Sequence, residues 1–278
     1  MFLLRFLKRN FIGIIIIGLL LGAFAYMHSG KDMTIEEEVI ILETYDAVLL
    51  FVGGDVKIRD GNATEWVDAT SGITLNAGDN LKTGDDSWAE VGFGVDFKNA
   101  LKIKEKTRLD FIEVGPVSVD LLKGEIRSLV EHLDEESSFE IKTPTAICGA
   151  RGTGWDTWTD GIQVAVNAYE NEVYFHSMTQ EGIITDYKVV KAGQSCILKD
   201  PDSPAEIEEL KEEKCEEWCD WKDDFGERRE SVKHDIVEGR YKITKRTATK
   251  VGVLKQDNGD WQLMILPPEE DDSTEEDE

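Results

Sequence analysis

Hydrophobic and polar positions divide the chain into three parts with different patterns. Residues 11–27 are an unbroken run of apolar and small side chains, residues 48–199 hold many short apolar runs with alternating polar positions, and residues 203–237 repeat apolar side chains at helical spacing. The first pattern is typical of a helix that spans a bilayer, the second of short β-strands, and the third of an amphipathic helix.

The central part is predicted to be mainly β. Turn sequences such as Gly53-Gly54-Asp55, Asp60-Gly61 and Ala192-Gly193 separate its short apolar runs, because glycine and aspartate favour the tight backbone of a turn. Many short strands at even spacing, with no alternating helices, predict an antiparallel β-sandwich or roll over residues 48–199. The expected strands include Val48–Ile58, Ser118–Leu122, Ile126–Leu133, Glu172–His176 and Ile183–Val190.

An amphipathic helix is predicted over residues 203–237. Ser203 and Glu206 have the spacing of a capping box and Pro204 suits the first helical position, so we expect the helix to begin there. The apolar stripe of this helix consists of Ile207, Leu210, Trp218, Trp221 and Phe225. We expect the stripe to pack on the β-domain or, through Trp218, Trp221 and Phe225, on a second copy of the helix.

The remaining C-terminal residues predict two smaller features. Residues 238–267 are expected to form a small β-hairpin, because Asn258-Gly259 suits a tight turn between the weakly apolar runs Lys250–Lys255 and Trp261–Leu266. Residues 268–278 are an acidic tail, and a block of like charge normally stays disordered and solvated.

The first thirty residues contain three basic side chains and no acidic one. By the positive-inside rule, residues 1–10 are a short cytoplasmic segment, residues 11–28 are a transmembrane anchor, and an acidic stem over residues 29–47 leads to the exported β-domain. The same segment also fits a cleavable signal peptide, because Ala23-Phe24-Ala25 resembles a cleavage site. Both interpretations place the bulk of the chain in the periplasm or at the cell surface, and retention of the segment makes the chain a single-pass membrane protein.

The net charge of -26 at pH 7, from 57 acidic and 31 basic residues, restricts the partners of the chain. Such an acidic chain repels nucleic acid and anionic lipid surfaces. The sequence also lacks a basic stripe with interleaved aromatic residues, which nucleic-acid-binding proteins commonly carry. We therefore expect no nucleic-acid binding, and a membrane contact only through the N-terminal apolar segment.

The sequence contains no recognisable catalytic motif. Its four histidines lack metal-ligand spacing, and it has no Walker, nucleophile-elbow or dinucleotide-binding motif. We therefore expect no enzyme activity, no cofactor and no metal site. Four cysteines in an exported chain favour disulfides. The arrangement that we expect joins Cys196 to Cys215 or Cys219 on the helix, and leaves Cys148 as a buried free thiol.

Short motifs follow one another along the β region, and their order carries a resemblance. They are Gly54-Asp55-Val56, Ala77–Gly84, Ser87–Phe93, Leu121–Ile126, Phe139–Ala146 with Arg151-Gly152-Thr153, and Lys191–Gln194. In this order, over a little more than half of the chain, they resemble the FecR domain family. The residues that carry the resemblance are Gly78, Asp79, Thr83, Gly84, Gly124, Thr143, Pro144, Arg151, Gly152, Thr153, Gly193 and Gln194. We expect structural roles for them in turns and strand ends, with Arg151 against backbone carbonyls or Asp156.

The resemblance implies an extracytoplasmic β-domain. Members of that family that regulate sigma factors carry a folded cytoplasmic segment before the membrane span, whereas ten residues precede Phe11 here. We therefore expect a membrane-anchored binding or scaffold module of the cell envelope, whose partner is an envelope protein or a cell-wall glycan. The alternatives are an accessory component of transmembrane signalling and a structural surface protein.

Overall fold

The computed structural model describes residues 47–94, 96–131, 133, 138–150, 152–179, 181–244, 251–255 and 261–265. The predicted cytoplasmic segment, membrane anchor and acidic tail lie outside these ranges, as do Arg151 and the predicted acidic stem except for Ala47, which begins the first strand. Among the described residues, no helix has the length and hydropathy that crossing a bilayer requires.

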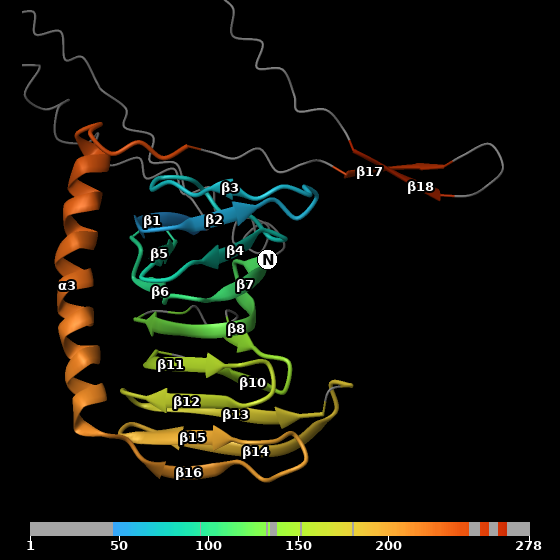
Figure 1. Cartoon of the computed structure of the whole chain (residues 1–278). Coiled ribbons are helices and arrows are strands. Elements are labelled where there is room, and N and C mark those ends of the chain that lie inside the picture. Colours follow the sequence, from blue (N-terminus) through green and yellow to red (C-terminus); the bar gives the residue numbers. More distant parts are fainter. Residues whose placement is uncertain are drawn as a thin grey trace, which may run out of the picture. The chain divides into compact units, whose positions relative to one another are not determined.

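Most of the described chain is β-strand (Figure 1). The strands are β1 (Ala47–Gly53), β2 (Val56–Arg59), β3 (Val67–Asp68), β4 (Asn80–Thr83), β5 (Trp88–Phe93), β6 (Asn99–Ile103), β7 (Arg108–Val114), β8 (Val117–Val130), β9 (Phe139–Lys142), β10 (Ala146–Gly149), β11 (Gly154–Thr159), β12 (Val164–Ala168), β13 (Glu172–Met178), β14 (Ile184–Lys191), β15 (Gln194–Leu198), β16 (Glu206–Glu209), β17 (Val251–Lys255) and β18 (Trp261–Ile265). The helix α3 (Glu212–Val237) follows β16. These elements confirm the prediction of a mainly β chain of many strands followed by one helix.

The first sixteen strands form two layers that share β8. Layer 1 has the order β3-β2-β4-β7-β8-β9-β10-β13-β14, and layer 2 has the order β1-β5-β6-β8-β11-β12-β15-β16. Within the two layers, neighbouring strands pair antiparallel except β8 and β9, which run parallel. β17 and β18 pair with each other, from Val251↔Ile265 to Lys255↔Trp261, at the position of the predicted hairpin.

Alternating apolar side chains from both layers fill the space between them. Three aromatic rings illustrate the interlocking, because Phe139 of layer 1 lies between Phe93 and Trp155 of layer 2. The ring centroids are 5.5 Å and 5.8 Å apart, and the ring planes are nearly perpendicular in both pairs. Such edge-to-face pairs contribute about 0.5–1.5 kcal/mol beyond the burial of their area, so these rings help to fix the layers against each other.

The structure corrects the predicted division of two strands. Residues 118–122 and 126–133 were expected to be separate strands, but β8 runs without interruption through both. Gly124 allows this continuity with a positive φ of 102°, and a Cβ at this position would collide with Thr107. Conversely, the single strand expected over residues 48–58 is broken at Gly54, whose φ is 78°, so that the chain passes from layer 2 to layer 1.

The predicted start of the helix at Ser203 is wrong. Residues 206–209 form β16, which pairs with β15 and places Ile207 opposite Cys196, and α3 begins only at Glu212. The backbone hydrogen bonds that β16 makes to the edge of layer 2 outweigh the local capping preference of the Ser203 sequence. Glutamates on both sides of Ile207 suit an exposed edge strand, because charged side chains discourage further strand pairing.

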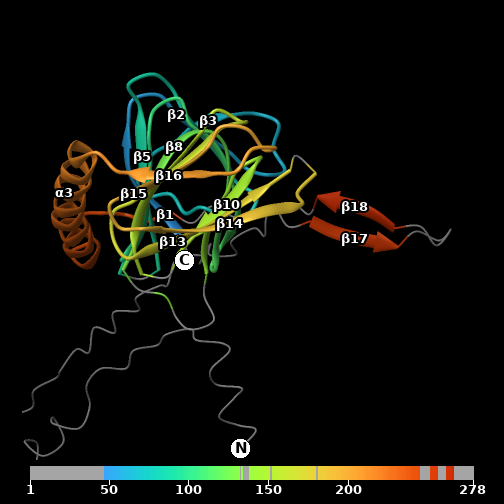
Figure 2. The ribbon, with the colours of Figure 1, turned by 90° about the horizontal axis from the view of Figure 1, so that it is seen from below.

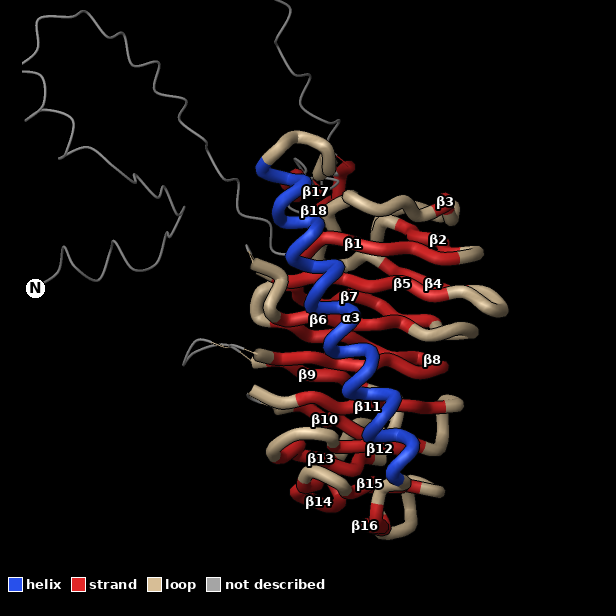
Figure 3. Tube along the Cα trace, turned by 90° about the vertical axis from the view of Figure 1, so that its left-hand side faces the viewer, coloured by secondary structure: helices blue, strands red, loops and turns tan. Residues whose placement is uncertain are grey.

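The helix α3 crosses the strands of layer 2 on their outer face (Figure 3). Figure 2 shows α3 beside β5 and β15, on the side away from β10 and β14. Its buried side chains are Trp218, Trp221, Phe225 and Val232. Trp218, Trp221 and Phe225 belong to the predicted stripe and pack on the β-domain, whereas Ile207 of that stripe is exposed. Self-association through the helix stays a prediction. Gly154 of β11 lies directly beneath Trp218, where a Cβ would collide with the indole ring.

We expect Gly154→Ala to destabilise the chain by about 1–3 kcal/mol, because the added methyl group forces Trp218 out of its position against β11. Gly226→Ala is the matched control, since a Cβ at Gly226 in α3 would meet no other atom within 4 Å. That change should stabilise the helix by about 0.5–1 kcal/mol. Urea unfolding of the purified chain measures both effects, and equal stability of the two variants would contradict the close packing of α3 on β11.

Candidate functional site

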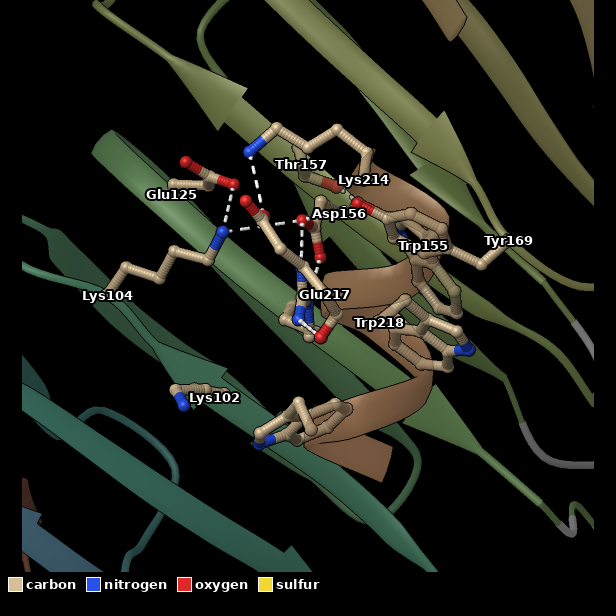
Figure 4. A network of polar contacts seen from close by, with 12 residues as sticks. Lys102, Lys104, Glu125, Trp155, Asp156, Thr157, Tyr169, Lys214, Glu217 and Trp218 are labelled. Atoms are coloured by element: carbon tan, nitrogen blue, oxygen red, sulfur yellow. Dashed lines mark hydrogen bonds and ion pairs between the residues drawn. The ribbon is translucent and has the colours of Figure 1, made fainter. Parts of the chain in front are cut away.

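A buried ion pair joins layer 2 to the helix. Arg127 on β8 and Asp156 on β11 are register partners whose side chains point away from the core, and they are 3% and 1% exposed. The Arg127 guanidinium donates from Nε to Asp156 Oδ1 at 2.8 Å and from Nη2 to Oδ2 at 2.9 Å. Its Nη1 donates to the backbone carbonyl oxygen of Glu217 in α3 at 2.9 Å (Figure 4). One side chain therefore connects two strands and the helix.

Aromatic rings from the β-domain and from α3 surround this ion pair. The Cζ atom of Arg127 lies 5.5 Å from the ring centroid of Tyr169 and 5.6 Å from those of Trp218 and Trp221. Tyr169 and Trp218 stack with centroids 4.8 Å apart, and the Tyr169 hydroxyl donates to Asp156 Oδ2 at 2.8 Å. The rings exclude water from the charges, which strengthens the attraction between them.

The charges of this pair are fixed near neutral pH. Burial alone would raise the pKa of Asp156, but the hydrogen bonds from Arg127 and the charge of Lys104, 3.4 Å away, hold that pKa below its ordinary value. Burial, reinforced by the charge of Asp156, raises the pKa of Tyr169. A general acid or base works best with a pKa near the working pH, and these groups are shifted away from it. The arrangement suits the attachment of α3 and not proton transfer.

Two further carboxylates hold the helix. Glu90 on β5 is fully buried and accepts hydrogen bonds from Trp221 Nε1 at 2.8 Å and from Arg228 Nη1 at 2.5 Å. Glu170 accepts one from Lys222 Nζ at 2.5 Å. Breaking the contacts of the buried Glu90 is costly because it leaves a charge without a counter-ion, whereas the Lys222–Glu170 pair is partly exposed. The helix α3 therefore covers the outer face of layer 2 by specific contacts.

The outer face of layer 1, which we call the open face, lies on the other side of the fold from α3 (Figure 2). The strand registers place one row of outward-pointing residues across it from β2 to β14. This row consists of Arg59, Asn80, Asp110, Asp120, Lys142, Ile147, His176 and Tyr187. The row begins with a basic residue, passes two acidic ones and ends in aromatic side chains.

An aromatic cluster of Tyr174, His176 and Tyr187 occupies one end of the open face. The His176 ring centroid lies 5.6 Å from that of Tyr174 and 4.9 Å from that of Tyr187. These side chains line a hollow of about 390 Å³ together with Glu140, whose Oε1 accepts a hydrogen bond from Tyr174 Oη at 2.6 Å. Tyr187 is 55% exposed and the neighbouring Ile184 is 56% exposed, so this end offers apolar surface next to polar groups.

A basic cluster of Arg59, Lys82 and Arg108 around the Trp66 ring occupies the other end. Arg59 Cζ, Lys82 Nζ and Arg108 Cζ lie 5.0, 4.4 and 6.0 Å from the ring centroid. Asn80 orients Arg59, because its Oδ1 accepts a hydrogen bond from Arg59 Nε at 2.8 Å. Cations near an indole face are attracted by the negative face of the ring. No local pattern in the sequence predicted this cluster.

The residues that carry the family resemblance lie mainly in turns and at strand ends. The positive φ angles of Gly78, Gly124, Gly152 and Gly193 are ones that glycine adopts readily. Six of the other residues form hydrogen bonds with backbone atoms. In turns, Asp79 Oδ2 accepts from Asn76 N, Thr143 Oγ1 accepts from Ala146 N beside Pro144, and Gln194 Oε1 accepts from Lys191 N. Between segments, Thr83 Oγ1 donates to Lys104 O, Gly84 N donates to Asp55 O, and Thr153 Oγ1 donates to Glu170 O. Asp156, the acid expected near Arg151, is bound by Arg127.

The four cysteines are free thiols. Cys148 and Cys196 lie in the core between the layers, and burial raises the pKa of each to about 12. Cys215 is half-buried and Cys219 is exposed on α3, which packs on the opposite face of layer 2 from Cys196. The structure therefore does not bring Cys196 together with the helix cysteines, and their disulfide stays a prediction. Among the described residues, no group of three or more His, Cys, Asp or Glu side chains could hold a metal ion.

Comparisons with known proteins give a family and a distant structural likeness. Residues 79–174 match the family model described as FecR protein. Two crystal structures of a "putative anti-sigma factor" from Parabacteroides distasonis, at 1.65 Å and 2.50 Å, resemble the chain with TM-scores of 0.42 and 0.41 and 14% sequence identity. The alignments cover 50% of this chain and only 64% and 63% of those chains. No curated protein matches the chain.

We expect Asp156→Asn to destabilise the chain by about 3–5 kcal/mol at pH 7, because Arg127 then stays buried without a counter-ion. The pKa of Asp156 is lowered by folding, so the stability that its charge contributes is present above pH ~4 and is lost as the pH falls through the lowered value. The difference between the two proteins should therefore shrink in acid.

Urea unfolding at pH 7, 5 and 3 measures this difference. Asp68→Asn is the control, because Asp68 forms an exposed ion pair with Lys57, and solvent-exposed pairs contribute little to stability. A loss at pH 7 no larger than that of the control would show that the Arg127–Asp156 pair does not hold α3.

Proposed function

We propose that this chain is a binding or scaffold module of the cell envelope. Residues 79–174 match a FecR domain. In this proposal the N-terminal apolar segment directs the module to the outside of the cytoplasm. The family match supports an envelope-associated regulator or binder and not an enzyme. The buried ion pair supports the same conclusion, because the pKa of Asp156 is lowered and that of Tyr169 is raised, away from the working pH of a general acid or base.

The difference between the two outer faces of the fold carries this proposal. The outer face of layer 2 is occupied by α3, whose Trp218, Trp221 and Phe225 are buried there. The open face of layer 1 has no such cover among the described residues, and it presents the aromatic cluster with its hollow of about 390 Å³. Exposed aromatic side chains beside polar groups are typical of surfaces that bind another molecule. The proposed partner, an envelope protein or a cell-wall glycan, therefore binds the open face.

The location outside the cytoplasm can be tested with the thiols of α3. We expect a membrane-impermeant maleimide to label Cys219 in intact spheroplasts after mild reduction, because Cys219 is exposed while Cys148 and Cys196 are buried. A Cys215→Ser, Cys219→Ser double variant is the control and should lose the label. Labelling that requires lysis of the spheroplasts would place α3 in the cytoplasm and contradict the proposal.

The binding surface can be tested by photo-crosslinking in the native host. A photoreactive residue in place of Tyr187, on the open face, should crosslink to an envelope component, whereas one in place of the exposed Asp223 on α3 should not. Adding Ile184→Glu should abolish the Tyr187 crosslink, because a charge would stand where apolar surface is needed. Equal crosslinking from both positions, or none from Tyr187, would reject the open face as the binding surface.

A further inference from the structure

The basic cluster holds three cations that form no ion pair with an acidic side chain in the part of the chain that the structure describes. The structure pairs Lys57 with Asp68, Lys106 with Asp85 and Lys104 with Glu125. By contrast, Arg59, Lys82 and Arg108 form no ion pair with any described residue, although the chain contains 57 acidic side chains.

The strand register brings these cations together. Lys82 and Arg108 stand directly opposite each other on β4 and β7, where like charges are unfavourable. Arg59 approaches the same Trp66 ring from β2, and the hydrogen bond to Asn80 holds its guanidinium there. A concentration of unneutralised positive charge on an otherwise acidic protein favours binding of an anion from outside.

The side chains define the chemistry of that anion. A guanidinium presents paired N–H donors that match the two oxygens of a carboxylate or phosphate. Arg108 supplies such a pair, whereas Arg59 donates from Nε and Nη2 to Asn80 Oδ1 and contributes chiefly its positive charge. The Trp66 indole adds a flat apolar surface that is only partly buried. Together these groups fit a sugar ring that carries an acidic substituent.

The neighbouring charges limit the size of the anion. Asp110 and Asp120 lie side by side on the same face, with Asp110 opposite Asn80. Neighbouring strands lie about 4.8 Å apart, so a continuous polyanion that crossed the face would meet these two carboxylates within a few strands. A glycan in which neutral sugars separate the acidic ones avoids this repulsion.

We infer that the basic cluster binds an acidic glycan of the cell envelope, with a carboxylate or phosphate group at Arg59, Lys82 and Arg108 and a sugar ring against Trp66. This inference rests on the proposed binding function and gives the chemical class of the partner. It assigns that partner to the end of the open face opposite the aromatic cluster.

Calorimetric titration of the purified full-length chain tests the inference with two probes, a tetrasaccharide of neutral sugars that carries one galacturonate residue and the same tetrasaccharide with one phosphate group in place of that carboxylate. We expect at least one probe to bind, and Arg108→Glu to weaken its binding by about tenfold or more, because a charge-assisted hydrogen bond is lost and a repulsive charge is added. Lys199→Glu makes the same change in net charge at an exposed residue paired with Glu206, and should leave the affinity unchanged within about twofold. Arg108→Gln, which adds no negative charge, should weaken binding in the same direction if the glutamate variant fails to fold.

Two further measurements separate a glycan from other anions. Trp66→Ala should weaken binding of the acidic glycan, and a neutral tetrasaccharide and tetraglutamate should both bind less well than the glycan. Equal binding of tetraglutamate that does not depend on Trp66 would assign the cluster to an acidic peptide and overturn the inference. Binding of neither probe would also overturn it, but the proposed function would stand if the Tyr187 crosslink were still obtained.

Discussion

The buried ion pair between Arg127 and Asp156 is the contact on which the attachment of the helix depends. Removing two charges from water is costly unless nearly every donor and acceptor finds a partner. Here the Asp156 carboxylate is bound by Arg127 and Tyr169, and the remaining guanidinium nitrogen reaches the Glu217 carbonyl of α3. Without α3 the pair would lose that acceptor and its aromatic cover. The ion pair and the helix therefore stabilise each other.

This attachment makes the two outer faces of the fold different. Charged side chains on the outer face of layer 2 hold α3, whereas the outer face of layer 1 keeps exposed side chains such as Tyr187, although Asn80 on the same face is buried. Both ends of α3 are also tied to the β-domain, because Leu210 N donates to Gly193 O before the helix and Tyr241 Oη donates to Leu50 O after it. A partner that approaches the domain meets the polar side of a helix on one face and the row from Arg59 to Tyr187 on the other. The second surface offers the more varied chemistry for recognition.

Local patterns in the sequence predicted the helices and strands better than the contacts between them. Period-two alternation identified most strands, and helical spacing identified Trp218, Trp221 and Phe225 as one stripe. The acceptor for Trp221 is Glu90, 131 positions earlier in the chain, and no local pattern indicates such a pair, although a glutamate in the middle of the apolar strand β5 is a signal that the position is unusual. The prediction of the helix start at Ser203 was wrong because strand pairing of residues 206–209 outweighed the capping sequence. The basic cluster was not predicted because Arg59, Trp66, Lys82 and Arg108 come from separate segments, and none of these residues is unusual within its own segment.

The acidity of the whole chain and the basic cluster on its surface are compatible because charge acts locally in salt solution. The Debye length is about 8 Å at physiological ionic strength, so a group bound against Trp66 experiences mainly Arg59, Lys82 and Arg108 and only weakly the acidic side chains elsewhere. The net charge of -26 still acts on any large anion, because such a molecule extends beyond the screened region and meets Asp110, Asp120 and the acidic surface beyond them. A small acidic group on a mostly neutral carrier gains the local attraction without this repulsion. The same charge distribution is therefore unfavourable for a long polyanion and compatible with the single acidic sugar that we propose as the ligand.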